Sequence, residues 1–385
     1  MAIAIKGSHY AIKTDNLYLP ERMTGIFWVE VKDGRVTGVT TSAPTGAEVV
    51  DLIGQVVAPG FIDTHIHGYK GFDIMDEGIK AVRGMATTLP ETGVTSFFPT
   101  TDTYILEGIE HILAETTPEL DTIPGAHPLG FHMEGPFLSK NKPGAMKVDM
   151  MVPPSIEKAA HALKAGRVVM MTVATELPGA LEMADYLRDH GCTVTIGHSA
   201  ATVEQAGEAF SHGINVITHY FNAMSGLNQR APGLVGAGMT YPFWLQLICD
   251  GAHSHPAAAG MVGRQYADRV ALITDALAVC GLPHPATYHA DGSDIIVDDT
   301  IARLPDGTIC GSILTLDHAV RNLMDFAGVP LQTALRCAGL NPALSAGIHD
   351  RGALRPGYWA DIVILDAQTL HVQATIREGQ QVFAA

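Results

Sequence analysis

The sequence has little positive charge and no long hydrophobic run, and both shortages exclude classes of function. It contains 24 lysine and arginine residues against 40 aspartate and glutamate residues, a formal net charge of −16. Nucleic acids and anionic membranes bind basic patches, so we expect neither as a partner. Apolar residues are nowhere uninterrupted over the roughly eighteen positions that a transmembrane helix needs. An anionic small molecule stays compatible with this charge, because a few local cations can bind a phosphate.

Cysteine is also scarce. The five cysteines, an odd number, are widely separated at Cys192, Cys249, Cys280, Cys310 and Cys337. This spacing predicts free thiols in a reducing compartment rather than a disulfide framework. The first residues, "MAIAIKGSHYAIKTDN", lack the apolar centre of a signal peptide. We therefore expect a cytoplasmic protein.

Eight short apolar runs dominate the middle of the chain, after an N-terminal segment of short strands with a hairpin signal at Asp33-Gly34. Helical stretches alternate with the runs, among them residues 155–166 and 202–213, which end in glycine as helices commonly do. The eight runs are residues 56–66, 94–99, 128–134, 168–174, 192–198, 215–219, 244–250 and 270–275.

Eight strand–helix units of this total length predict an α/β protein with a (β/α)8 barrel. A doubly wound open sheet is the competing interpretation. The tail after residue 349 returns to β character, so both chain ends are expected to build one small β-sandwich domain. We predict that residues 1–57 and 349–385 form this domain and that residues 58–348 form the barrel.

Histidine is the one residue that is unusually frequent, with 18 copies. The stretch "FIDTHIHG", residues 61–68, ends the first barrel run. Side chains alternate along a strand, so Asp63, His65 and His67 are expected to face the barrel mouth. Ile62, Thr64 and Ile66 are then expected to face the helices.

Other runs also end in residues that can bind a metal. His132 and Glu134 share a face at the end of the third run, and the fifth, sixth and eighth runs end at His198, His219 and Asp275. Catalytic groups of barrel enzymes lie at the carboxyl ends of the strands. A lone histidine there is more often structural than a ligand, but this many donors at one rim favour a metal site.

The donor types indicate which metal and which chemistry to expect. Imidazole and carboxylate without cysteine fit zinc, and iron, manganese or cobalt could bind the same set, as one or two ions. Asp275 is then the expected general base, taking a proton from an activated water and passing it to an amine leaving group.

Longer motifs in this order resemble one family. "PGFIDTHIHG", the strand-end histidines, "TDA" and the tail "GALRPGYWADIVILD" are similar to the amidohydrolase superfamily. "FHMEGPFLSKNKPGA", "TIGHSAAT", "THYFNAMSGLNQRAPGLVGA", "CDGAHSHP" and "DGTICGSILTLDHAVRN" resemble the N-acetylglucosamine-6-phosphate deacetylases and their N-acetylgalactosamine-6-phosphate relatives. The fourth run, "VVMMTVATE", lacks the lysine that relatives with a carboxylated lysine need there.

The resemblance implies a set of site residues. Glu134, His198 and His219 are expected to hold the main metal, and His65 with His67 match an H-x-H motif that some members use for a second ion. The residues that match the family's substrate site are Ala145, Asn222, Ala223, Arg230, His253, Ile309, Cys310 and Gly311. In the family, Arg230 and His253 are expected to serve the site of a neighbouring subunit, which implies a homodimer.

One departure from the family concerns the position after "NKPGA", where Met146 replaces a histidine that contacts substrate. Methionine donates no strong hydrogen bond. The leading hypothesis is a metal-dependent deacetylase of N-acetyl-amino-sugar 6-phosphates, of either the glucosamine or the galactosamine series. The alternatives are a deacetylase or amidase for a different N-acyl substrate, because of Met146, and a barrel that binds sugar phosphate without turnover.

Overall fold

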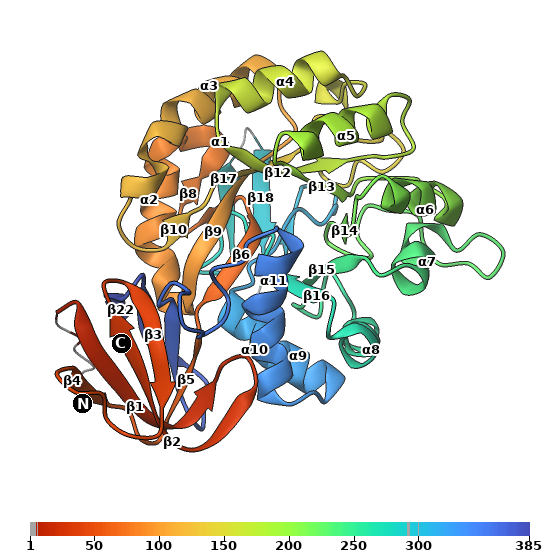
Figure 1. Ribbon diagram of the computed structural model, residues 1–385. Helices are drawn as coiled ribbons and strands as arrows, with labels where there is room; N and C mark the ends of the chain where they lie inside the picture. Colours follow the sequence, from red (N-terminus) through yellow and green to blue (C-terminus); the bar gives the residue numbers. More distant parts are fainter. Residues whose placement is uncertain (1–4, 6, 291–292, 299) are drawn as a thin grey trace.

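A parallel barrel forms the larger part of the molecule (Figure 1). The computed structural model describes residues 5, 7–290, 293–298 and 300–385. Eight parallel strands form the barrel wall, in the order in which they occur along the chain. They are β6 Phe61–Ile66, β9 Val94–Thr101, β11 Phe131–Glu134, β12 Val168–Val173, β13 Thr193–Ile196, β14 Val216–Ile217, β15 Trp244–Ile248 and β16 Val270–Ile273.

The first and last strands meet and close the barrel. The backbone N–H of Asp275, just beyond β16, donates to the carbonyl oxygen of His65 in β6 at 2.9 Å. The N–H groups of His67 and Gly68 both donate to Ala276 O, also at 2.9 Å. An open doubly wound sheet would leave these two edges apart, so the predicted (β/α)8 barrel is confirmed and the open sheet is wrong.

Helices surround the barrel wall, as Figure 1 shows. Ser155 caps α4 by accepting from Lys158 N, and Thr202 and Gln205 form a capping box at the start of α6, so both predicted helices are present. The α-helices are α1 Ile74–Glu77, α2 Ile79–Thr88, α3 Leu106–Thr116, α4 Ile156–Ala165, α5 Ala180–Asp189, α6 Val203–Ser211, α7 Gly233–Thr240, α8 Pro256–Tyr266, α9 Leu316–Ala327, α10 Leu331–Ala338 and α11 Leu340–Ser345. Short 3-10 turns are η1 Leu89–Thr92, η2 Thr117–Thr122 and η3 Val148–Met150.

The two chain ends share one mixed sheet beside the barrel, seen at the lower left of Figure 1. Antiparallel pairing of β5 with β20 joins the N-terminal and C-terminal strands. Asp33 and Gly34 both have positive φ, as the predicted hairpin turn between β2 and β3 requires. The strands are β1 His9–Tyr18, β2 Arg22–Lys32, β3 Arg35–Thr40, β4 Glu48–Asp51, β5 Gln55–Pro59, β20 Ile362–Asp366, β21 Val372–Arg377 and β22 Gln380–Ala384.

This terminal sheet has its own apolar core, separate from that of the barrel. Ile12 of β1, Val29 of β2 and Ile364 of β20 are all fully buried in it. The hydroxyl of Tyr10 also reaches across to donate to Gly379 O at 3.0 Å. Strand β5 extends to Pro59, two residues beyond the expected end of the N-terminal segment, and the division at residues 57 and 349 stays a prediction.

The run at residues 56–66, predicted as one strand, is divided between the two sheets. β5 belongs to the terminal sheet and β6 to the barrel, with Gly60 between them. A Cβ at Gly60 would lie 2.2 Å from the Thr95 side chain of β9, so only glycine fits where the chain passes from one sheet to the other. The run at residues 128–134 is similarly divided into β10 His127–Pro128 and β11.

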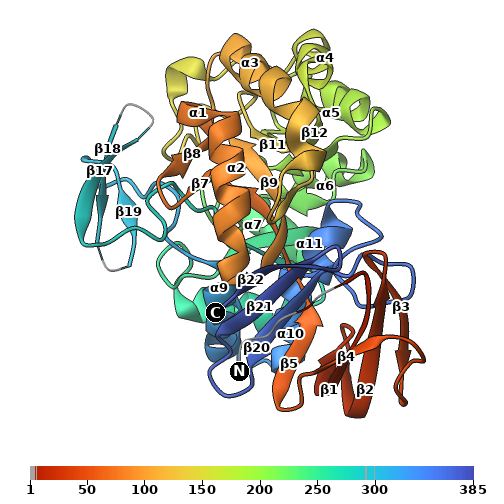
Figure 2. The same ribbon diagram turned by 90° about the vertical axis from the view of Figure 1, so that its left-hand side faces the viewer.

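Two small sheets lie at the carboxyl end of the barrel and were not predicted. β7 Gly68–Tyr69 pairs with β8 Phe72–Asp73 directly after β6. β17 Ala286–Ala290, β18 Ser293–Val297 and β19 Ala302–Arg303 form a three-stranded sheet between β16 and α9. Figure 2 shows this second sheet on the side of the barrel away from the terminal sheet.

Candidate metal centre and cavity

The side chains of β6 lie at the carboxyl rim, but their alternation is interrupted. His65 and His67 are buried and point toward each other, with their Nε2 atoms 3.2 Å apart. Thr64, expected on the helix side, instead accepts a hydrogen bond at 3.3 Å from Gln246 of β15, a strand that is not its neighbour, so the contact crosses the barrel interior. That expectation is wrong, because the pairing of β6 with β9 shifts register on both sides of Ile62 and Asp63.

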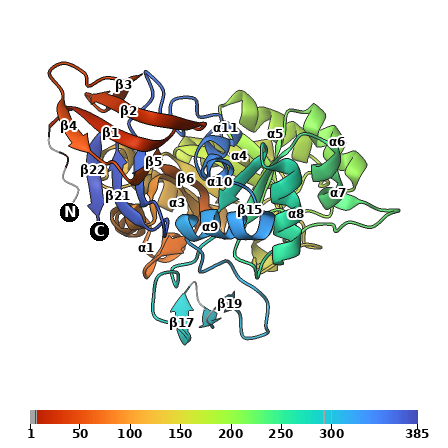
Figure 3. The ribbon, with the colours of Figure 1, turned by 90° about the horizontal axis from the view of Figure 1, so that it is seen from below.

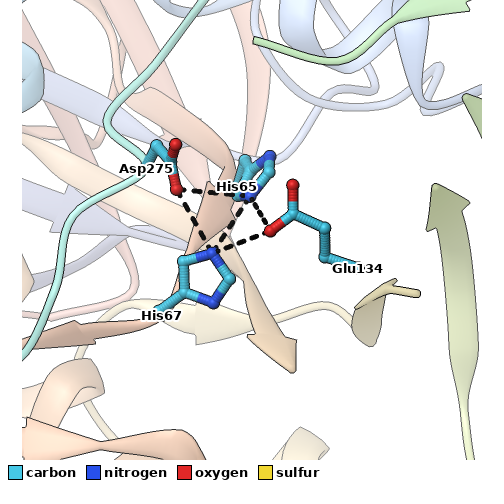
Figure 4. A group of neighbouring side chains, drawn as sticks. All are labelled: His65, His67, Glu134 and Asp275. Atoms are coloured by element: carbon cyan, nitrogen blue, oxygen red, sulfur yellow. Dashed lines mark hydrogen bonds and ion pairs between the residues drawn. The ribbon is translucent and has the colours of Figure 1, made fainter. Parts of the chain in front are cut away.

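His65, His67, Glu134 and Asp275 form one compact group of donor atoms (Figure 4). The Nε2 atom of His67 is 3.2 Å from both Glu134 Oε2 and Asp275 Oδ1. The Nε2 atom of His65 is 3.3 Å and 3.4 Å from the same two oxygens. One proton on an imidazole cannot satisfy three neighbours at once, so hydrogen bonding alone does not explain this convergence.

The spacing of these atoms fits a metal ion. Four ligands about 2.0–2.1 Å from a tetrahedral ion lie about 3.3–3.4 Å from one another. The five contacts above, including the one between the histidines, are 3.2–3.4 Å. A central cation would also offset the repulsion between the two buried carboxylates. The residues therefore fit a divalent ion coordinated by two imidazoles and two carboxylates.

Glu134 also belongs to a second group, with His198 and His219. Its other oxygen, Oε1, is 3.2 Å from His198 Nε2 and 2.9 Å from His219 Nε2, and the two nitrogens are 3.1 Å apart. Because Oε2 faces the first group and Oε1 the second, Glu134 bridges them. This arrangement fits two neighbouring ions, each with part of one shared carboxylate.

Unusual backbone conformations place three of these side chains. His198, His219 and Asp275 each follow a barrel strand and have φ values of 45°, 30° and 51°. Non-glycine residues rarely adopt this left-handed region, which costs about 1–3 kcal/mol each, and such strain clusters at functional sites. The left-handed turn lets each side chain leave the strand direction and point toward Glu134.

Both carboxylates of the centre are ionised in this environment. Burial would raise the pKa of Asp275, but the charge of His65 and a hydrogen bond with His67 together lower it to about 2. Burial opposes ionisation of Glu134 too, and the charge of His65 with bonds from His198 and His219 holds its pKa well below the usual range. Asp275 is therefore a carboxylate at neutral pH, as a ligand or a general base must be.

His132 lies beside the centre without joining either group. One ring nitrogen is 3.0 Å from Thr64 O and the other is 2.8 Å from Thr172 Oγ1, so both are in hydrogen bonds. Burial, followed by the charge of His65, lowers its pKa well below the ordinary value. His132 is a neutral structural residue of the barrel interior.

A cavity of about 480 Å³ opens onto both donor groups. Seven of the eight residues expected to contact substrate line it: Ala145, Asn222, Ala223, His253, Ile309, Cys310 and Gly311. Met146 lines it as well. The Nδ1 atom of His253 is held by Asp250 Oδ2 at 2.6 Å, which fixes the ring.

Arg230 is the exception, because it does not line the cavity of its own chain. It is exposed, in the loop before α7 that projects from the barrel in Figures 1 and 3. Leu227 in the same loop is 57% exposed. The structure therefore does not bring Arg230 together with the other predicted substrate residues.

Lys147 and Asp102 are among the cavity residues that the sequence reasoning missed. Lys147 is the only lysine or arginine among the described residues that line the cavity, and it follows Met146 directly. Asp102 is the first residue after β9 and lies 3.1 Å from His67. A search for carboxylates after every barrel strand would have found Asp102, since the ends of the second and seventh runs had not been considered with the others.

Comparison with known proteins shows the family of the chain. Residues 56–382 match the amidohydrolase family, and the chain belongs to that family. N-acetylgalactosamine-6-phosphate deacetylase of Escherichia coli O157:H7 is 34% identical over 357 residues, covering 91% of this chain and 93% of the relative. N-acetylglucosamine-6-phosphate deacetylase of Lysinibacillus sphaericus is 34% identical over 361 residues, covering 91% and 92%.

A solved structure supports the same family. N-acetyl-D-glucosamine-6-phosphate deacetylase from Mycobacterium smegmatis, determined in complex with N-acetyl-D-glucosamine-6-phosphate, superposes with a TM-score of 0.89 at 31% identity. The match covers 98% of this chain and 100% of that structure. The family predicted from the motifs is therefore confirmed.

Among the described residues, no helix has the length and apolar character that crossing a bilayer requires.

Proposed function

We propose that this protein hydrolyses the acetamide of an N-acetyl-amino-sugar 6-phosphate, giving acetate and the amino-sugar 6-phosphate. The observation that carries the proposal is the cavity that opens onto the two donor groups and Asp275. Seven residues that resemble the family's sugar site line the same cavity. The deacetylases named above match nearly the whole chain, which supports the same reaction class here.

The chemistry follows from the positions of the side chains. Bound divalent ions would polarise the acetyl carbonyl and lower the pKa of the attacking water. Asp275, ionised and at the edge of the cavity, accepts the proton from that water and then donates it to the sugar nitrogen as the C–N bond breaks. Glu134, His198 and His219 would hold one ion, and His65, His67, Glu134 and Asp275 would hold the second. The ligand types favour zinc over iron, manganese or cobalt.

The sugar phosphate needs cations that the metal centre does not supply. His253 and Lys147 line the cavity within the chain, whereas Arg230 lies on the projecting loop. Arginine binds phosphate in a bidentate fork. We propose a homodimer in which Arg230 contributes to the neighbouring subunit's site. His253, expected to do the same, instead lines the cavity of its own chain, so we assign it to that site. The exposed Leu227 beside Arg230 gives that loop an apolar contact for the partner.

The protein is proposed to act in the cytoplasm. All five cysteines are free and buried, as expected, which supports a reducing compartment.

The test measures acetate release from four compounds by metal-loaded protein. They are N-acetylglucosamine 6-phosphate, N-acetylgalactosamine 6-phosphate and the two unphosphorylated sugars. We expect turnover of at least one phosphorylated compound, with kcat/KM well above that of its unphosphorylated form. Equal values with and without phosphate would refute the phosphate assignment, and no release from any compound would refute the deacetylase.

Met146 supports a second candidate, a deacetylase or amidase for a different N-acyl group. Met146 lines the cavity, as do Leu277, Ile295 and Leu304, so part of the cavity lining is apolar. An apolar wall favours an acyl chain longer than acetyl. If N-butanoyl substrates had a higher kcat/KM than N-acetyl ones, this candidate would replace the first.

A further inference from the structure

Asp102 lies against the outer nitrogen of a metal-binding histidine. Its Oδ1 is 3.1 Å from His67 Nδ1, on the side of the ring opposite the Nε2 atom that faces Glu134 and Asp275. The side chain of His67 is 5% exposed and that of Asp102 is 24% exposed. The contact is therefore partly shielded from water, where an ion pair is stronger than at the surface.

The other three histidines of the centre lack such a partner. His198 Nδ1 is 3.1 Å from the carbonyl oxygen of Lys142. The Nδ1 atoms of His65 and His219 are buried and have no hydrogen-bond partner in the described structure. Among the described residues, Asp102 is thus the one carboxylate recorded within ion-pair distance of an outer histidine nitrogen at this centre.

A second carboxylate near the rim, Asp73, is a helix cap rather than a partner of His67. It caps α1 by accepting from the backbone N–H groups of Met75 and Asp76 at 2.9 Å and 3.3 Å. Burial, and then the charge of Asp102, raise the pKa of Asp73 to about 7. Asp73 is therefore engaged with the helix, and Asp102 is the carboxylate that meets His67.

We propose that Asp102 is a positioning residue that holds His67 with its proton on Nδ1 and its Nε2 lone pair directed at the second ion. A carboxylate beyond a ligating histidine fixes the tautomer and ring orientation and makes the nitrogen a stronger ligand. Asp102 therefore controls how tightly the ion at His65, His67, Glu134 and Asp275 is retained. The ion at Glu134, His198 and His219 does not depend on it. This inference rests on the two-ion centre of the proposed function.

The test is a metal titration that involves no sugar. Metal-free protein, prepared with a chelator, is titrated with Zn²⁺ against a competing chromophoric chelator. We expect two equivalents for the wild type. In Asp102→Asn, one equivalent should bind about 10–100-fold more weakly while the other keeps its affinity, because outer-shell changes typically have that effect. Asp102→Glu, which retains the carboxylate, should recover part of the loss.

Asp76→Asn is the matched control. Asp76 is exposed in the first turn of α1 and is not among the residues that line the cavity, so its substitution removes a negative charge outside the site. It should leave both affinities unchanged. Far-ultraviolet circular dichroism of each variant checks that the barrel is folded.

Three results would overturn the proposal. They are unchanged binding of both ions in Asp102→Asn, equal weakening of both, and a wild type that binds a single equivalent. Failure to release acetate from any sugar phosphate would refute the proposed function instead, and it would leave the titration valid.

Discussion

The side chain of Asp275 both belongs to a donor group and lines the cavity. Its Oδ1 is 3.4 Å from His65 Nε2 and 3.2 Å from His67 Nε2, so it belongs to the first donor group. It also lines the cavity, where a substrate and its attacking water would lie. In the proposed mechanism Asp275 is both a ligand and the base, so turnover would depend on the occupancy of one ion.

Replacing Asp275 with asparagine should therefore affect catalysis and one ion together. We expect kcat to fall by at least about 10²–10⁴-fold, the usual contribution of general acid–base catalysis. Metal analysis after dialysis should show weaker retention of the ion at His65 and His67 and normal retention at Glu134, His198 and His219. Near-normal kcat in fully loaded Asp275→Asn would contradict the role as base.

At the scale of single residues, the sequence could predict which residue types form the site. It could not predict which residues contact the metal-site histidines from outside. The H-x-H spacing placed His65 and His67 together, and their Nε2 atoms do meet. The contact of Asp102 with His67 joins two strands about 35 residues apart, which no local spacing reveals. The left-handed φ values of His198 and His219 depend on the turn after each strand rather than on the histidines themselves.

At the scale of elements, the existence of the barrel strands was easier to predict than the residues at which they begin and end. Each of the eight apolar runs overlaps a barrel strand, because buried parallel strands are continuously apolar. The division at Gly60 was missed, since the apolar pattern continues from β5 into β6. The sheet of β17–β19 was missed because its sequence is polar and rich in turn residues.

Gly60 gives a direct test of that division. A Cβ there would lie 2.2 Å and 2.4 Å from the Thr95 side-chain atoms Cγ2 and Oγ1. Gly60→Ala should lower the free energy of unfolding by about 1–3 kcal/mol, as overpacking commonly does. Urea unfolding followed by circular dichroism measures the change.

The control for this prediction is Gly226→Ala. A Cβ at Gly226 meets no atom within 4 Å, so its effect should stay within about 0.5 kcal/mol. Equal stability of the two variants would mean that the β5–β6 junction has room to move.

For the whole molecule, the place of Arg230 is the feature that a single chain does not explain. It lies on a projecting loop and lines no part of its own cavity, yet it matches a substrate residue of the family. A C₂ dimer would let each loop reach the partner's cavity, since the same contact is then made twice.

Mixing two inactive variants tests this arrangement. Arg230→Ala and Asp275→Asn should each have low activity, but a heterodimer would contain one site with both native residues. After subunit exchange, we expect activity to rise to about a quarter of the wild-type value, because half of the dimers are mixed and each has one complete site. No recovery in a mixture shown by native mass spectrometry to contain heterodimers would mean that Arg230 serves its own chain or none.

The pairing of β5 with β20 has a consequence for biosynthesis. These strands are separated by about 300 residues, so the pairing is among the most non-local that the chain makes. A ribosome delivers β1–β5 first and β20–β22 last, with the whole barrel between them. Strand β5 and the apolar face around Ile12 and Val29 therefore stay unpaired until nearly all of the chain has been translated. During that interval they are an exposed sheet edge of the kind that chaperones bind and that aggregates recruit.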